Sequence, residues 1–155
     1  MAQYTVFTIG HGQLTWDAFA RLLSPHHVEV LVDVRSFPYV EAAPWFNRDR
    51  LEHLARSEGL EYLWLGGHLG PLTDDGRVDY IAKEREPRYR EGISTLLTLA
   101  AERIVCLLAA QADPMLSHRH HLIAQTLLKH DVGVVHLLEQ GGSMPAQADL
   151  FHSHA

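Results

Sequence analysis

The chain has 155 residues and only one cysteine, Cys106, which limits the chemistry open to it. A single cysteine cannot form an internal disulfide or a cysteine-based zinc site, and it fits a reducing compartment. Cys106 lies within an apolar run, where it is typical of a packing residue rather than a nucleophile. We therefore expect no redox chemistry within one chain.

Long hydrophobic runs and lysine are also scarce. No apolar run approaches the ~18 residues that a membrane span needs, and the N-terminal residues lack the basic start of a secretory signal. These absences predict a cytoplasmic protein with no membrane partner.

Of the 13 cationic residues only Lys83 and Lys129 are lysines, and the formal net charge is -6. We expect no non-specific coating of nucleic acid, because such binding needs a basic face.

The common nucleotide and metal fingerprints are missing as well. The segment Gly10-His11-Gly12 is too short for a dinucleotide motif, and neither a GxxxxGK[ST] loop nor an HExxH pattern is present. The sequence thus predicts no nicotinamide or ATP, no cofactor and no metal. Three nearby histidines do not change this, because on an α-helix only residues three or four apart share a face. By that rule His118 and His121 could converge while His120 points elsewhere.

What the chain does contain is an alternation of short apolar runs and amphipathic segments, which predict strands and helices respectively. The predicted strands are 4–9, 28–32, 60–64, 104–108 and 132–135, and the predicted helices are 15–23, 47–57, 89–101 and 114–129. Such alternation is typical of right-handed crossovers between parallel strands. We expect a single three-layer α/β domain over residues 1–139, Rossmann-like, with a mostly parallel sheet of about five strands flanked by helices.

Two stretches fall outside this pattern. Residues 66–87 are rich in glycine, proline and balanced charge, which fits either an exposed insertion that acts as a lid or a solvated connector. Residues 140–155 begin with a Gly-Gly-Ser sequence that is typical of a flexible linker. We expect this second stretch to be a flexible C-terminal tail.

Polar side chains follow the predicted strands where each strand ends. Ligands of open parallel sheets bind beyond the carboxyl ends of the strands, so these side chains are expected to converge on one edge. Arginines beside the start of a helix favour an anion, because guanidinium groups and free backbone N–H groups both bind negative charge. The predicted anion-binding residues are Arg35, Arg119, Ser117 and Gln111.

The same edge carries candidate catalytic residues, namely His11, Asp33 and His118. A hydrolysis without a thiol nucleophile is the most coherent reaction, with a histidine as general acid or base and Asp33 as the orienting carboxylate. Two simpler interpretations stay open at this point. Asp33 and Arg35 also fit a buried ion pair that fixes a loop, and His11 also fits a helix-capping role.

Several of these residues stand in motifs that resemble a known family. Thr8-Ile9-Gly10-His11, Asp33-Val34-Arg35-Ser36-Phe37-Pro38 and Ser117-His118-Arg119 occur in the order typical of the family called domain of unknown function 488. The resemblance runs from about residue 5 to residue 137. It implies an α/β, Rossmann-like fold and places the candidate residues on motif positions, but it implies no established activity.

The chain also departs from that family's pattern. Where family members commonly read Cys-Ala-Glu and Cys-His-Arg, this chain has Ala109-Ala110-Gln111 and Ser117-His118-Arg119. Family chemistry that depends on a thiol at these positions cannot run here, although Ser117 can still form hydrogen bonds or cap a helix. Binding is expected to survive this loss better than catalysis.

A short motif near the C-terminus points to a partner. Residues 147–151 read Gln-Ala-Asp-Leu-Phe, which resembles the pentapeptide by which bacterial replication and repair proteins bind the sliding clamp. Leu150 and Phe151 would fill an apolar pocket while Gln147 and Asp149 lie at its rim. The alternative is that the terminal apolar pair folds back on the domain.

Together these features favour an accessory protein of DNA replication or repair. Its α/β domain would bind phosphate or nucleic acid at the strand edge. Its tail would bind the clamp and so hold the domain close to DNA, which would make a basic surface unnecessary despite the acidic net charge. Two alternatives stay open: a hydrolase or transferase acting on a phosphorylated or carboxylated metabolite, and a binding module that has lost its catalytic residues.

Overall fold

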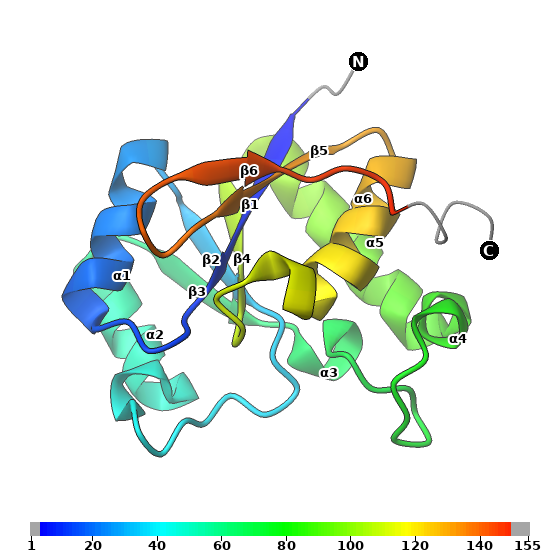
Figure 1. Cartoon of the computed structure of the whole chain (residues 1–155), viewed down its shortest axis with the longest axis horizontal. Helices are drawn as coiled ribbons and strands as arrows, with labels where there is room; N and C mark the ends of the chain where they lie inside the picture. The colour runs from blue at the N-terminus through cyan, green and yellow to red at the C-terminus, as the bar shows by residue number, and fades with distance from the viewer. Residues whose placement is uncertain (1–3, 150–155) are drawn as a thin grey trace.

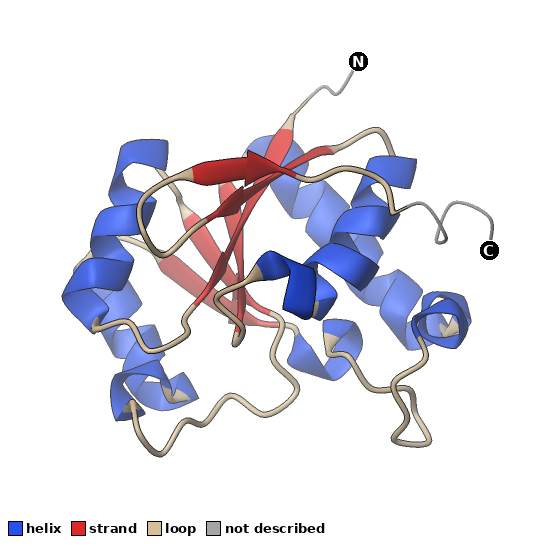
Figure 2. Ribbon diagram, in the orientation of Figure 1, coloured by secondary structure: helices blue, strands red, loops and turns tan. Residues whose placement is uncertain are grey.

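Six strands form one sheet in the computed structural model, which describes residues 4–149 (Figures 1 and 2). The order across the sheet is β3-β2-β4-β1-β5-β6; the first five strands are parallel, and β6 is antiparallel to β5. This confirms the predicted mostly parallel α/β sheet and adds one strand to it. The strands are β1 (Thr5–Gly10), β2 (Val30–Asp33), β3 (Glu61–Trp64), β4 (Val105–Ala109), β5 (Gly133–Leu137) and β6 (Ser143–Pro145).

Helices cover both faces of the sheet. In Figure 2, α1 (Trp16–Leu23) and α2 (Arg48–Ser57) lie on one side of the strands, and α5 (Pro87–Glu102) and α6 (Gln125–Lys129) lie on the other. Thr15 begins α1 as the sequence indicates, because its side chain accepts a hydrogen bond from the Ala18 N–H. The shorter helical segments are α3 (Gly66–Leu69), α4 (Tyr80–Arg85) and the 3-10 turns Ser24–His26, Pro44–Phe46 and Pro114–Leu116.

The hydrophobic core is divided by the sheet into two halves. Successive side chains of a strand point to opposite faces, so Val105 and Leu107 of β4 pack with α5 and α6 while Cys106 and Leu108 pack with α1 and α2. Every residue of β2 and β4 is buried. Apart from Asp33 at the end of β2, these residues are apolar, as is typical of central parallel strands covered on both faces.

The segment predicted as one α-helix over 114–129 is not one. Asp113 and Pro114 do begin a helical turn, with the Asp113 carboxylate accepting the Met115 N–H at 2.9 Å, but that turn is a 3-10 helix. After a break at Ser117, a π-helix runs over Arg119–Ala124 and continues into α6. π-turns are rare and frequently occur at functional sites. The three-to-four spacing used in the prediction therefore does not apply to the residues at the start of this segment.

The two ends of the stretch 66–87 pack against the domain, whereas residues 74–78 between them are exposed. It contains α3 and α4, and Lys83 of α4 is only 3 % exposed, its Nζ donating to the Leu72 carbonyl at 2.6 Å. No helix within residues 4–149 is long and apolar enough to cross a membrane.

The glycines that predict a linker form the turn between β5 and β6. Gly141 adopts a φ of 102°, which few other residues tolerate, and the Leu138 N–H donates to the Gly142 carbonyl at 2.9 Å. Beyond β6 the chain runs back along α6 as far as Asp149. Leu150 and Phe151 lie outside the described residues.

Candidate functional site

A cavity of about 500 Å³ opens at the carboxyl ends of β1, β2 and β4. This is the edge at which the sequence predicts a site, and five of the predicted residues line the cavity: His11, Arg35, Gln111, Ser117 and His118. Asp33 lies directly behind Arg35, while Pro71 and Tyr80 bring the stretch 66–87 to one wall. The other lining residues are Ser36, Phe37, Tyr39, Val40, Ala110 and Leu116.

Asp33 and Arg35 form a buried ion pair at the base of this cavity. Arg35 Nε and Nη2 donate to the two oxygens of Asp33 at 2.8 and 2.7 Å, and Nη2 also donates to the Phe46 carbonyl at 2.8 Å. Tyr62 donates its hydroxyl to the same carboxylate at 2.6 Å. The pair therefore fixes the loop after β2, as one interpretation of the sequence holds. One nitrogen of the guanidinium has no part in these bonds: Arg35 Nη1 is buried and has no hydrogen-bond partner among residues 4–149.

His11 presents a free ring nitrogen beside this arginine. Its Nδ1–H donates to the Gly12 carbonyl at 3.0 Å, and the ring stacks on Phe46 with centroids 4.9 Å apart. Burial lowers the pKa of His11 below 6.5, and the charge of Arg35 lowers it further. Nε2 has no partner in the described part of the chain. In the neutral ring that nitrogen carries a lone pair, which suits a general base or a hydrogen-bond acceptor for a ligand.

Ser117 and His118 hold the neighbouring segment in place. Ser117 Oγ accepts the Arg119 N–H at 3.1 Å, so it keeps the hydrogen-bonding role that the sequence leaves open to it. His118 Nε2 donates to the Val34 carbonyl at 3.0 Å, and burial lowers the pKa of His118 to about 4. Its ring is neutral near pH 7 and its Nε2 proton is engaged. Of the two histidines in the cavity, His11 is therefore the better candidate base.

Arg119 takes a different place from the one predicted. The sequence favours it as an anion-binding residue, but it is fully buried and does not line the cavity. Its guanidinium donates to Thr8 Oγ1 in β1 and to the Ala112 carbonyl, the latter at 2.9 Å. Residue 119 begins the π-helix and points into the core, where it fixes the loop after β4. We therefore assign it a positioning role.

The rim of the cavity is unusually apolar for a surface. Phe37 is 74 % exposed and Leu116 is 71 % exposed, and the rings of Phe37 and Tyr39 lie 5.2 Å apart. An apolar rim above a polar base suits a ligand that has both an anionic and an aromatic part. These rim residues are not among those predicted from the sequence, although Phe37 stands inside the Asp33–Pro38 motif and was the available signal.

A family model described as domain of unknown function DUF488 matches residues 15–126, which is well over half of the chain. The chain belongs to the DUF488 family. This confirms the resemblance to that family, and the motifs at Arg35 and His118 lie within the matched residues while the motif at His11 precedes them. No curated protein and no solved structure matches the chain. The DUF488 description assigns no activity to the family.

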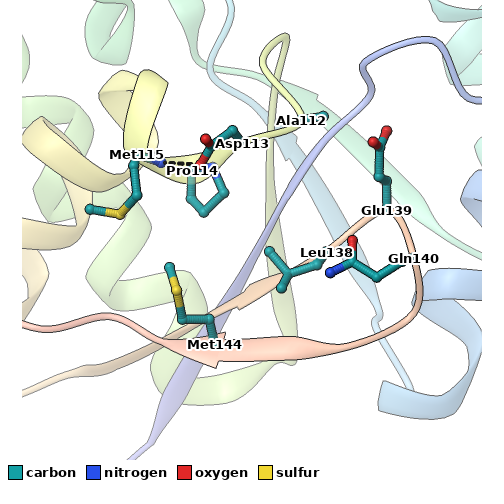
Figure 3. Close-up of a pocket in the computed structure, with 8 residues that line it drawn as sticks. All are labelled: Ala112, Asp113, Pro114, Met115, Leu138, Glu139, Gln140 and Met144. Atoms are coloured by element: carbon teal, nitrogen blue, oxygen red, sulfur yellow. Dashed lines mark hydrogen bonds between the residues drawn. The ribbon is translucent and has the colours of Figure 1, made fainter.

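A second, smaller cavity of about 330 Å³ lies beside the β5–β6 hairpin of this DUF488 chain (Figure 3). Figure 3 shows Leu138 and Met144 on the hairpin side and Asp113 and Met115 on the opposite side. None of the predicted catalytic residues lines it. Ala112, in the loop after β4, lines this second cavity, and its carbonyl accepts the hydrogen bond from Arg119.

The predicted clamp-binding segment lies against the DUF488 domain up to its third residue. The Gln147 carbonyl accepts Gln125 Nε2 at 3.1 Å, and the Asp149 N–H donates to Gln125 Oε1 at 2.8 Å. The Asp149 carboxylate contacts His120 Nε2 at 2.9 Å and His121 Nδ1 at 2.7 Å. The histidines that lie together are thus the adjacent pair His120 and His121, and not His118 and His121 as α-helical spacing indicates.

Proposed function

We propose that this chain binds a phosphate group carried by a nucleotide unit, either free or in single-stranded nucleic acid. The observation that carries the proposal is the buried, unpartnered Nη1 of Arg35, a residue that lines the cavity. A guanidinium stays charged at any physiological pH, and a buried donor without a partner costs about 1–3 kcal/mol. An anion in the cavity would remove that cost. Asp33 supports the same binding because it holds the guanidinium in one orientation.

Neighbouring groups extend the anion site. The Ser117 hydroxyl and the exposed Gln111 amide line the same cavity, and both can donate hydrogen bonds to phosphate oxygens. His11 Nε2 accepts rather than donates while the ring is neutral, so it suits a protonated oxygen or a water molecule. This arrangement also supports hydrolysis as a second candidate function, with His11 as the base that takes a proton from water and Arg35 as the group that stabilises the resulting negative charge.

The aromatic rim supports a nucleotide over a simple anion. Bases stack on exposed aromatic side chains, and each such contact contributes about 1–3 kcal/mol. Phe37 and Tyr39 are paired at the mouth of the cavity, where a base attached to a bound phosphate could reach them. A local site of this kind does not require the basic surface that the net charge of -6 excludes.

We further propose that the C-terminal motif recruits the protein to the sliding clamp as a replication or repair accessory factor. The motif Gln147–Phe151 supports this, and tethering at the clamp would raise the effective concentration of nucleic acid at the cavity. Because Gln147 and Asp149 contact the domain, clamp binding through these residues competes with those contacts.

The ligand proposal is tested by calorimetric titration with inorganic phosphate, a nucleoside monophosphate and a short single-stranded oligonucleotide. We expect the double variant Phe37→Ala/Tyr39→Ala to lose about tenfold or more in affinity for the nucleotide ligands while its affinity for phosphate stays unchanged. Val78→Ala, which removes an exposed apolar side chain away from the cavity, is the matched control. Equal nucleotide affinity in all three proteins would contradict the proposal, and selective binding of phosphate alone would favour a small metabolite.

The recruitment proposal is tested separately, by binding to a bacterial sliding clamp from the same source. Micromolar binding is expected for the natural chain, and its loss is expected for Leu150→Ala/Phe151→Ala. The Phe37→Ala/Tyr39→Ala variant serves as the control that keeps clamp binding. Absence of binding by the natural chain would remove the clamp from the function without affecting the cavity.

A further inference from the structure

We propose that His120, His121 and Asp149 form a binding site for a divalent transition-metal ion of the zinc class. The three side chains come from the π-helix and from the segment after β6, and their ligand atoms all lie within 4.8 Å of one another. The site lies apart from the strand-end cavity, whose lining includes none of the three. It is therefore independent of the ligand proposed for that cavity, whereas clamp binding through Asp149 would compete with it.

His121 offers the clearest evidence, because its two ring nitrogens have different partners. Nε2 lies 2.7 Å from the Met115 carbonyl, which only an N–H can face favourably. In the neutral ring Nδ1 then carries the lone pair, yet Nδ1 lies 2.7 Å from Asp149 Oδ2. A lone pair and a carboxylate oxygen repel each other unless a cation lies between them. That cation is either a proton on the ring or a metal ion.

His120 is oriented by a buried chain of side chains. Its Nδ1 lies 3.0 Å from His136 Nε2, and His136 Nδ1 lies 2.6 Å from Thr8 Oγ1. Metal-binding histidines characteristically donate their second N–H to such a partner, which fixes the ring and raises the basicity of the ligand nitrogen. Arg119 Nη1, which can only donate, lies 3.3 Å from His136 Nδ1, so without a metal His136 Nε2–H donates to His120 Nδ1 and His120 Nε2–H donates to Asp149 Oδ1 at 2.9 Å. A metal ion on His120 Nε2 would replace that proton and reverse the His120–His136 hydrogen bond. The need for a cation at the Asp149 carboxylate therefore comes from His121, and His120 places a second ring nitrogen within reach of the same ion.

Asp149 is held in position for this role and is open to an ion. Its backbone N–H is bound by Gln125, and the preceding chain is fixed to the sheet because the Ala146 N–H donates to the Val134 carbonyl at 2.8 Å. The side chains of His121 and Asp149 are 34 % and 24 % exposed, whereas that of His120 is buried. An ion can therefore reach the site from solvent on one side.

The donor set selects the class of metal. Two imidazole nitrogens and one carboxylate suit zinc, iron, cobalt or nickel, whereas calcium and magnesium prefer oxygen ligands alone. Three protein ligands leave a tetrahedral ion one position for water or another small ligand. The alternative is that a shared proton makes the cluster a simple ion pair, which would give no measurable metal affinity.

The test is competition for Zn²⁺ between the full metal-free chain and a chromophoric chelator, followed by the visible absorption of the Co²⁺ form. We expect one site per chain. Asp149→Asn and His121→Gln are each expected to weaken binding by more than about 100-fold, because even the loss of a group behind the ligands costs 10–100-fold. Both positions are partly exposed, so the variants are expected to fold, and circular dichroism checks this.

Two controls separate this site from adventitious binding. His53→Gln removes an exposed histidine elsewhere on the domain and should leave the affinity unchanged. His152→Gln/His154→Gln removes the histidines that follow the motif in the sequence, and this variant should also keep the site. The proposal is overturned if the natural chain does not bind Zn²⁺, if Asp149→Asn binds it equally well, or if binding disappears with the terminal histidines alone.

Discussion

Arg35 and Asp33 bind each other through two parallel hydrogen bonds, although only one residue separates them in the sequence. The carboxylate is fully buried, and it also accepts the Arg35 backbone N–H at 3.1 Å. The pair thus closes the loop after β2 onto itself and leaves Nη1 of Arg35, a residue that lines the cavity, buried and without a partner among the described residues. The structure of this loop and the proposed ligand site therefore involve the same two side chains.

Replacing Asp33 should therefore lower the free energy of unfolding. Asp33→Asn leaves the charge of Arg35 buried without its partner, and removal of one member of a buried pair costs about 3–5 kcal/mol. Urea unfolding measures the change in free energy. Glu52→Gln is the control: it removes the exposed partner of Arg56 and should cost less than about 0.5 kcal/mol. Similar costs for the two variants would show that the buried pair is not important for stability.

Gly66 is required by the close approach of two backbones. A Cβ at this position would lie 1.8 Å from the Arg35 carbonyl oxygen and 2.5 Å from Trp64 Nε1, two atoms that hydrogen-bond to each other at 2.9 Å. We expect Gly66→Ala to destabilise the fold by about 1–3 kcal/mol or more, measured by thermal or urea unfolding. Gly142→Ala meets nothing within 4 Å and should change stability by less than about 0.5 kcal/mol. A Gly66→Ala protein as stable as that control would contradict the close approach of the two segments.

His11 should contribute to the pH dependence of stability. Burial lowers its pKa in the folded state below 6.5, so the unfolded chain binds more protons as the pH falls through that value. Unfolding free energy is therefore lost on acidification, starting near pH 6.5 and ending below the folded pKa. His11→Gln should show a flatter decline between pH 7 and about pH 5.5 in urea unfolding. His53→Gln, at an exposed position, is the control, and identical slopes for natural chain and His11→Gln would refute this role.

The only thiol should be unreactive in the folded protein. Cys106 is fully buried in β4, and burial raises its pKa far above the ordinary thiol value. A thiol-specific reagent is expected to modify the native chain only as fast as the chain unfolds, and to modify it at once in concentrated denaturant. Rapid labelling under native conditions would show that the strand opens locally.

The parallel core of the fold could be predicted because its strands are buried on both faces. Runs such as those of β2 and β4 read as short, nearly continuous apolar segments, which is typical of strands buried on both faces. β6 could not be predicted in this way. Its three residues, Ser143–Pro145, have neither length nor alternation, and they form a strand only because the Gly141–Gly142 turn places them against β5.

The candidate site was predictable to the extent that it follows from strand ends. His11 and Arg35 come directly after parallel strands, so topology alone brings them to one edge. Arg119 and Asp149 depend on features that a single sequence does not reveal. The π-helix changes which side chains of the segment after Ser117 point inward, and the contact of Asp149 with His120 joins residues 29 positions apart through tertiary packing.

The antiparallel strand at the end of the sheet also bears on how the protein can be handled. β6 covers the open side of β5, an apolar strand, and Pro145 at its end has no N–H with which to continue the pairing. Shortening the chain at residue 139, the boundary that composition indicates, would expose the backbone of β5 to a second molecule. Such a fragment is expected to aggregate on expression, because β6 would no longer cover that edge of β5.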